Sequence, residues 1–245
     1  MNNSSVFRNF LILGCFCAAA AGYLLLKNPT ITPYENLERG LTAYSQKKYE
    51  KAARYFEKAK DAGMPEAMFV LGNMYINGFG VPLNITTAIS YYRRAAEEQY
   101  TPALYTLALL YMEGSLVVQD TALAHVYISK AAENGDVEAM TTLATWYERG
   151  YLGGGKTDLA VSWYKKAAKL GDTNAQTALS LFYARGMYGL KKDYKEAAYW
   201  RNALEKKQAY ADRFSGKKQQ EKNSMSFSLD KLPKLKNFTP IRINK

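Results

Sequence analysis

The sequence is poor in the residues that build metal centres and nucleophilic active sites. Among 245 residues it has one histidine, His125, and two cysteines, Cys15 and Cys17. Both cysteines lie in an apolar N-terminal segment, so the rest of the chain can form neither a disulfide framework nor a thiolate metal site. The single histidine excludes a multi-histidine metal centre and is expected to be structural. Because the carboxylates are also scattered, we expect no enzyme activity and no cofactor.

Acidic residues are too few to balance the basic ones, and the formal net charge is +11. Residues 205–245 contain 11 Lys and Arg against 4 Asp and Glu, which leaves only +4 for the 204 residues before them. Since this excess is not laid along a helix face, we expect no nucleic-acid partner. We expect a capping extension at 205–216, followed by a disordered basic tail at 217–245 that can touch anionic surfaces.

Long apolar runs are absent except at residues 10–26, where 17 residues carry no charge. As a helix this segment would span about 25 Å, close to the roughly 30 Å hydrocarbon core of a bilayer. We therefore expect a single-pass membrane anchor between a short N-tail (1–9) and a linker (27–33). The weak charge asymmetry across the span favours placing the rest of the chain in the periplasm or outside the cell.

Two other interpretations of the apolar segment remain open. Cleavage within Ala18–Ala21 would give a secreted protein. The sequence Ile12-Leu13-Gly14-Cys15 resembles a bacterial lipobox, so a lipoprotein acylated at Cys15 is the second alternative.

A 36-residue repeat organises the chain from residue 67 onward. Three residue types recur at this interval: Ala67, Ala103, Ala139 and Ala175; Leu71, Leu107, Leu143 and Leu179; Tyr75, Tyr111, Tyr147 and Tyr183. A period of this size, with small and aromatic residues at fixed offsets, is typical of a solenoid of stacked helix pairs. Polar residues at 84, 120 and 193 are placed to cap the second helix of a pair, and glycines at 63, 135 and 171 are placed to end it.

The combined pattern A-x-x-x-L-G-x-x-Y-x-x-G…A-x-x-Y-Y-x-x-A-A resembles the Sel1-like repeat, a relative of the tetratricopeptide repeat. The resemblance covers residues 67–204 as four hairpins of a bacterial envelope type. Residues 34–66 resemble a tetratricopeptide repeat through Gly40, Ala52, Phe56 and Ala59. The resemblance implies an all-α protein: an α-solenoid of antiparallel helix pairs, one tetratricopeptide-like and four Sel1-like, behind an N-terminal apolar helix.

The run from Gly150 to Thr157, GYLGGGKT, formally satisfies the phosphate-loop pattern G-x-x-x-x-G-K-[ST]. That loop binds phosphate only between a strand and a helix. The preceding residues have helical periodicity and are in register with the other repeats. We therefore expect the run to be an ordinary inter-helix loop.

The resemblance also implies a site, because the first helix of a tetratricopeptide-type hairpin lines the concave face. We expect an extended or helical peptide to bind there, with an apolar first half and two arginines available for a carboxylate in the second half. Asn73 and Asn77 are favoured, because hydrophobic packing between hairpins would not explain polar side chains at these positions. The predicted protein-binding residues are Leu41, Phe69, Asn73, Asn77, Tyr105, Leu109, Met112, Thr145, Glu148, Arg149 and Arg185.

The expected function is a membrane-tethered scaffold or adaptor that presents this groove to another protein outside the cytoplasm. The membrane contact would be made through residues 10–26. Two alternatives stay open: a secreted factor that acts on another cell, and a regulator of an envelope enzyme or complex that works through the basic tail.

Overall fold

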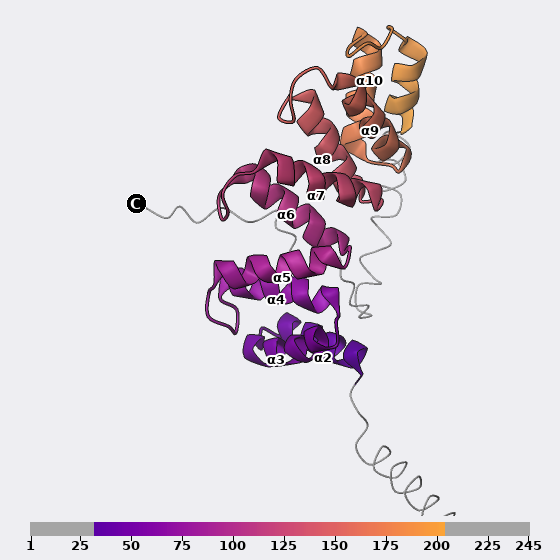
Figure 1. Cartoon of the computed structure of the whole chain (residues 1–245). Helices are drawn as coiled ribbons and strands as arrows, with labels where there is room; N and C mark the ends of the chain where they lie inside the picture. The colour runs from indigo at the N-terminus through magenta and orange to yellow at the C-terminus, as the bar shows by residue number, and fades with distance from the viewer. Residues whose placement is uncertain (1–31, 204–245) are drawn as a thin grey trace, which may run out of the picture.

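The computed structural model describes residues 32–203, which form antiparallel helix pairs stacked in one direction (Figure 1). This described part contains no strand, which confirms the all-α prediction. A further helix occupies residues 194–203. The labelled helices are α2 (Pro33–Ser45), α3 (Tyr49–Asp61), α4 (Pro65–Asn77), α5 (Ile85–Glu97), α6 (Thr101–Glu113), α7 (Thr121–Glu133), α8 (Val137–Glu148), α9 (Thr157–Lys169) and α10 (Thr173–Arg185).

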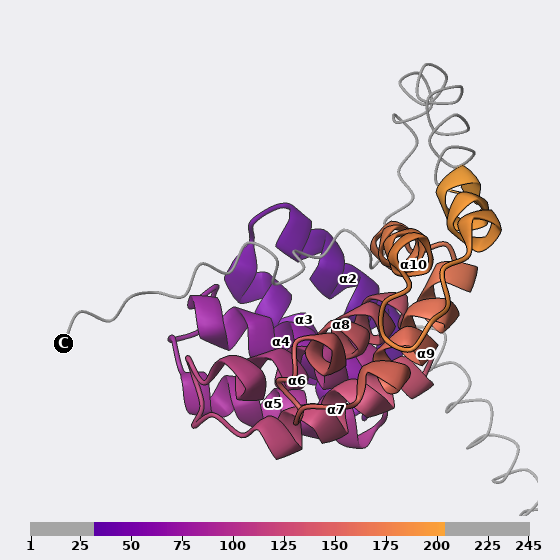
Figure 2. The same cartoon turned by 90° about the horizontal axis from the view of Figure 1, so that it is seen from above.

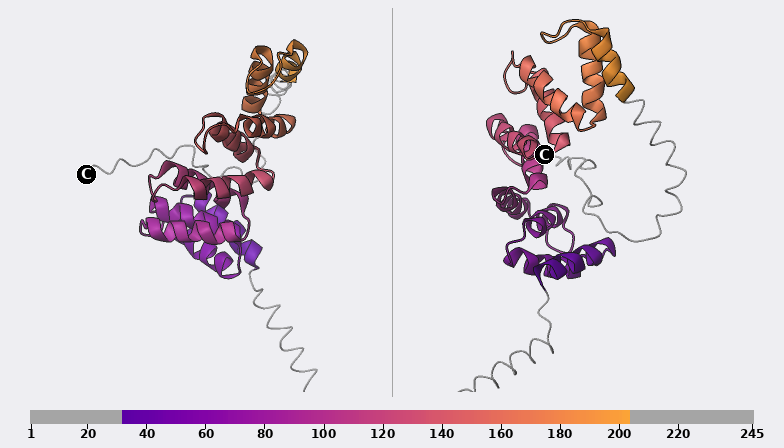
Figure 3. Two further views of the ribbon diagram at one scale, coloured as in Figure 1. Left: turned by 45° about the horizontal axis from the view of Figure 1, so that its top comes forward. Right: turned by 90° about the vertical axis from the view of Figure 1, so that its right-hand side faces the viewer.

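Each pair packs on the next through its second helix. Helices α2 and α3, α4 and α5, α6 and α7, and α8 and α9 form the pairs, and α3, α5, α7 and α9 each also contact the first helix that follows. The stack curves along its length (Figure 3). Seen from above, α6, α8 and α10 lie on the inner side of the curve, and α5, α7 and α9 lie toward its outer side (Figure 2).

The repeated small residues set how closely the helices of a pair approach. A Cβ added at Gly72 would lie 2.5 Å from the Tyr92 ring, and one added at Gly40 would lie 2.6 Å from the Phe56 ring. Glycine at these positions therefore lets the aromatic ring of the second helix pack directly on the backbone of the first. The repeated leucines and alanines lie in the core with 0% exposure, at Leu71, Leu107, Leu143 and Leu179 and at Ala67, Ala103, Ala139 and Ala175.

The predicted helix ends are confirmed. The Asn84 side chain accepts from Thr87 N at 3.0 Å, and the Asp120 side chain accepts from Leu123 N at 2.8 Å. The Asp193 side chain accepts from the backbone of residues 195 and 196. The glycines at 63, 135 and 171 have φ values of 83°, 92° and 88°, the left-handed conformation that ends a helix.

The predicted anchor at residues 10–26 and the predicted tail at 217–245 both lie outside the described residues. Across residues 32–203, none of the helices combines the length and apolar character needed to cross a bilayer. The anchor therefore stays a prediction from the sequence.

Candidate functional site

A hollow of about 400 Å³ opens between α8 and the first turn of α10. It contains Thr145 from the predicted groove together with Thr141, which lies one turn earlier on the same helix. The full lining is Glu138, Thr141, Thr142, Thr145, Trp146, Asp172 and Asn174.

The lining of this hollow is rich in hydrogen-bond acceptors. Both threonine hydroxyls on the α8 face donate to their own helix, Thr141 to Val137 O at 3.1 Å and Thr145 to Thr141 O at 2.9 Å. With those donors engaged, the two hydroxyl oxygens keep only acceptor capacity, and Glu138 and Asp172 add carboxylates to the lining. No cationic side chain lines the hollow. This arrangement suits a ligand group that donates, such as a lysine, arginine or amide.

Residues from two neighbouring hairpins stabilise the hollow. The Tyr105 hydroxyl on α6 lies 3.3 Å from Glu138 Oε1 and 3.2 Å from Thr142 Oγ1. Burial raises the pKa of Tyr105 to about 12, so it stays a neutral donor at physiological pH. Asp172 caps α10 by accepting from Ala175 N at 2.7 Å. The carboxylates of the hollow are therefore held by the fold.

The apolar part of the predicted groove lies on α4 and α6. Phe69, Tyr105, Leu109 and Met112 are half-buried and pack against the main core. The Phe69 ring lies 5.5 Å from the rings of Tyr92 and Tyr100. Each of these side chains thus supports the fold with one face and leaves its other face accessible.

Two predicted groove residues are buried. Leu41 is 6% exposed and Asn73 is 8% exposed. Asn73 Oδ1 accepts a hydrogen bond from the Tyr92 hydroxyl at 2.7 Å. The expectation that packing within the fold does not explain Asn73 is therefore wrong. Asn77 is exposed, and its Nδ2 donates to Asn73 O at 2.7 Å.

Glu148 also has partners within the array. Its carboxylate accepts from the Tyr164 hydroxyl at 2.6 Å and from the Tyr188 hydroxyl at 3.1 Å. Tyr164 belongs to the same hairpin and Tyr188 to the loop of the next one, so Glu148 joins two repeats. Arg149 and Arg185, predicted to bind a carboxylate, are exposed and lie outside the lining of the hollow.

The remaining chemical candidates have ordinary environments. His125 Nε2 lies 2.7 Å from the Tyr147 hydroxyl. Burial, and secondarily the charge of Lys156, lowers the pKa of His125 below its usual value. The glycine-rich run follows α8 rather than a strand, as predicted for an inter-helix loop. Within residues 32–203, no three His, Cys, Asp or Glu side chains gather as a metal site would require.

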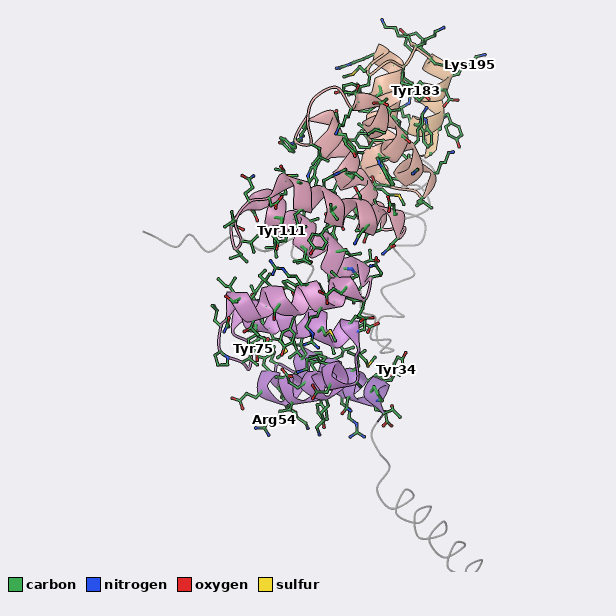
Figure 4. All side chains as sticks on the ribbon, viewed as in Figure 1. Tyr34, Arg54, Tyr75, Tyr111, Tyr183 and Lys195 are labelled. Carbon is green, nitrogen blue, oxygen red and sulfur yellow. The ribbon has the colours of Figure 1, made fainter. Side chains whose placement is uncertain are left out.

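Charge divides between the two kinds of helix. The first helices (α2, α4, α6, α8 and α10) hold six acidic and two basic residues, a net charge of −4. The labelled second helices (α3, α5, α7 and α9) hold six acidic and ten basic residues, a net charge of +4. Arg54 on α3, for example, points away from the stack (Figure 4). The inner face is therefore acidic relative to the outer face.

The concave-face positions of α8 include Thr141 as well as Thr145, and the other five lining residues were missed by sequence reasoning: Glu138, Thr142, Trp146, Asp172 and Asn174. The concave-face offsets carried over from tetratricopeptide hairpins mark one stripe of the first helix. The hollow lies between the first helices of two successive hairpins, α8 and α10, and includes the cap and first turn of α10. The cap position of Asp172 was the one available signal, since a capping residue must lie at a helix entrance.

The Sel1 repeat model matches five successive segments, at residues 36–64, 65–100, 101–136, 137–172 and 173–200. It thus also covers the first hairpin, whose short loop resembles a tetratricopeptide repeat. No curated protein matches the sequence.

Two solved structures are similar over the array. A Sel1 repeat protein from Oxalobacter formigenes is 30% identical with a TM-score of 0.64, over 72% of this chain and 74% of that one. The protein c5321, a protective antigen of uropathogenic Escherichia coli strains with the same repeat fold, is 27% identical with a TM-score of 0.62, over 72% of this chain and 39% of that one. Five family-model matches and the likeness to these structures show that the chain belongs to the Sel1 repeat family.

Proposed function

We propose that this chain is a membrane-tethered scaffold whose inner face binds a peptide segment of another protein outside the cytoplasm. Sel1 repeat proteins are protein-interaction scaffolds, which supports the general class. The observation that carries the proposal is the hollow between α8 and α10, where acceptor groups meet the indole of Trp146. The half-buried apolar side chains of α4 and α6 extend this surface along the inner face.

The partner segment should be basic or rich in amide donors. The hollow presents two carboxylates and three threonine hydroxyls, and the first helices carry a net charge of −4. An acidic segment would be repelled there. A lysine or arginine can donate to the rim while its aliphatic stem covers the indole.

The tether is proposed from residues 10–26, whose 17 uncharged residues match the length of a bilayer-spanning helix. Alkaline extraction of membranes and protease treatment of intact cells test it: the chain should stay in the membrane pellet while the array is digested from outside. The mass of the mature protein separates the alternatives, because cleavage within Ala18–Ala21 removes about 2 kDa. Release into the medium would instead favour the secreted factor.

Cross-linking in the native membrane, followed by identification of the captured protein, tests the binding site. Thr141→Arg should fill the hollow and reduce capture at least about tenfold. Its matched control is Ser162→Arg, which adds the same side chain at an exposed position on α9. Equal capture by both variants would contradict the site, and loss in both would indicate a general effect of added charge.

A further inference from the structure

The basic tail contains a regular pattern that the array does not use. Apolar residues occur at every third position from 229 to 241, with Pro233 and Pro240 among them, and Lys231, Lys234 and Lys236 lie between. The apolar series is Leu229, Leu232, Leu235, Phe238 and Ile241. A polyproline II helix has three residues per turn, so this series would form one apolar edge beside basic residues.

The inner face of the array has the complementary chemistry. Phe69, Leu109 and Met112 offer apolar surface on α4 and α6, and each is half-buried. Glu113 at the end of α6 is exposed, and Glu138 on α8 lines the hollow. An extended segment with an apolar edge and a basic edge fits a face with apolar and acidic side chains, whereas the outer face has the same sign of charge as the tail.

The tail is long enough to reach this face. The last described residue, 203, belongs to a helix that packs on α10, where Ser180 Oγ donates to Ala197 O at 3.0 Å. The start of α10 itself lines the hollow, and packed helices lie about 8–10 Å apart, which puts the hollow within about 20 Å of the helix at 194–203. The 25 residues from 204 to 228 would span on the order of 25–30 Å as a flexible chain.

We propose that residues 229–241 bind across the inner face of their own array and close it to other partners. The apolar edge covers the α4 and α6 side chains, and the lysines lie beside Glu113 and Glu138. This inference rests on the groove of the proposed function and adds an occupant to it. The scaffold is then held closed until a partner displaces the tail.

A weak contact is sufficient for this closure. A tether of this length gives an effective concentration of about 1 mM. If the tail binds the groove with a dissociation constant of about 0.1 mM, about nine molecules in ten are closed. A partner that needs the open groove then binds with an apparent Kd about tenfold higher than its intrinsic one.

The test uses the full chain in detergent with a photo-cross-linker in place of Phe238. Cross-links should fall on α4, α6 and α8, and Glu113→Lys with Glu138→Lys should reduce them at least about tenfold. The matched control is Glu97→Lys with Glu133→Lys, which makes the same charge change at exposed positions of the second helices α5 and α7 and should leave the cross-links intact. Adding Lys234→Glu and Lys236→Glu to the groove variant, which is Glu113→Lys with Glu138→Lys, should restore the cross-links.

Three results would overturn the inference. They are cross-links on the outer helices, cross-links that the groove variant leaves unchanged, and cross-links that join two copies in a mixture of isotope-labelled and unlabelled protein. Partner capture is measured separately. If Thr141→Arg loses partner capture but the tail forms no cross-links to the array, the groove remains the binding site and the tail is excluded as its occupant. Tail cross-links with no captured partner would retain the internal contact and count against the proposed function.

Discussion

The contact between Asn73 and Tyr92 allows a test of whether an apparent groove residue belongs to the fold. Asn73 Oδ1 accepts from the Tyr92 hydroxyl at 2.7 Å, and both side chains are buried. Burial raises the pKa of Tyr92 strongly, so the hydroxyl keeps its proton and needs an acceptor. The equivalent positions one repeat later are Leu109 and Ile128, an apolar pair, which shows that the fold also accepts both positions without polar groups.

Asn73→Leu keeps the approximate size of the side chain but leaves the Tyr92 hydroxyl without its acceptor. An unsatisfied buried polar group costs about 1–3 kcal/mol, and the better helix propensity of leucine recovers a few tenths. Tyr92→Phe leaves Asn73 Oδ1 without its donor and should cost about 1–2 kcal/mol. Because the double variant removes both groups, it should be more stable than the sum of the single effects by about 1–2 kcal/mol.

Thermal unfolding followed by circular dichroism measures these differences, with about 2–4 °C expected per kcal/mol for a chain of this size. Amide hydrogen exchange in α4 and α5 reports the same loss locally, since repeat arrays open repeat by repeat. Single effects that add in the double variant would refute the reasoning. So would an Asn73→Leu protein that is as stable as the wild type yet fails to bind its partner.

Three further predictions follow from local geometry and titration. Gly80→Ala should lower the free energy of unfolding, measured in urea, by at least about 2 kcal/mol, because φ is +68° and the new Cβ would lie 2.3 Å from the backbone of α3. Gly154→Ala is the control, since its new Cβ would meet nothing within 4 Å. The histidine resonance of His125 should titrate below the ordinary histidine pKa, since burial disfavours the charged ring. The free energy of unfolding should then fall as the pH drops below about 6.5. A titration midpoint above about 6.5 would contradict this prediction. Burial raises the pKa values of Tyr100 and Tyr105 to about 12, so their contribution to stability is complete below pH 10 and is lost as pH rises toward 12. The last part of the tyrosinate absorbance should therefore rise together with unfolding rather than before it.

The fold was largely predictable because the sequence features that specify it are local and repeated. The alanines and leucines at 36-residue intervals form the core, and the glycines at 40 and 72 allow the close approach that the motif requires. Caps such as Asn84 and Asp120 depend on neighbours three residues away, which a sequence shows directly. Each of these features is settled within one hairpin and its neighbour.

The site was harder to predict because it depends on which side chains are already engaged. Sequence offsets placed Asn73 and Glu148 on the inner face, but Tyr92, Tyr164 and Tyr188 take up their polar atoms. Those tyrosines lie 16 to 40 residues away along the chain. The offsets also omitted Asp172, since they count positions within one helix and the hollow lies between two. Spacing alone cannot show that a polar side chain is occupied.

Contacts between the two helices of a hairpin help to explain where the hollow lies. In two hairpins the position of Asn73 on the first helix and the position of Tyr92 on the second helix carry polar side chains that bond to each other. Asn73 pairs with Tyr92, and Thr145 bonds to Tyr164 at 3.0 Å. The pair at 109 and 128 is apolar. In α8 the contact with Tyr164 takes up a side chain in the middle of the helix, so the hollow on that helix extends toward its N-terminal half. It extends from Thr145 back through Thr141 to Glu138.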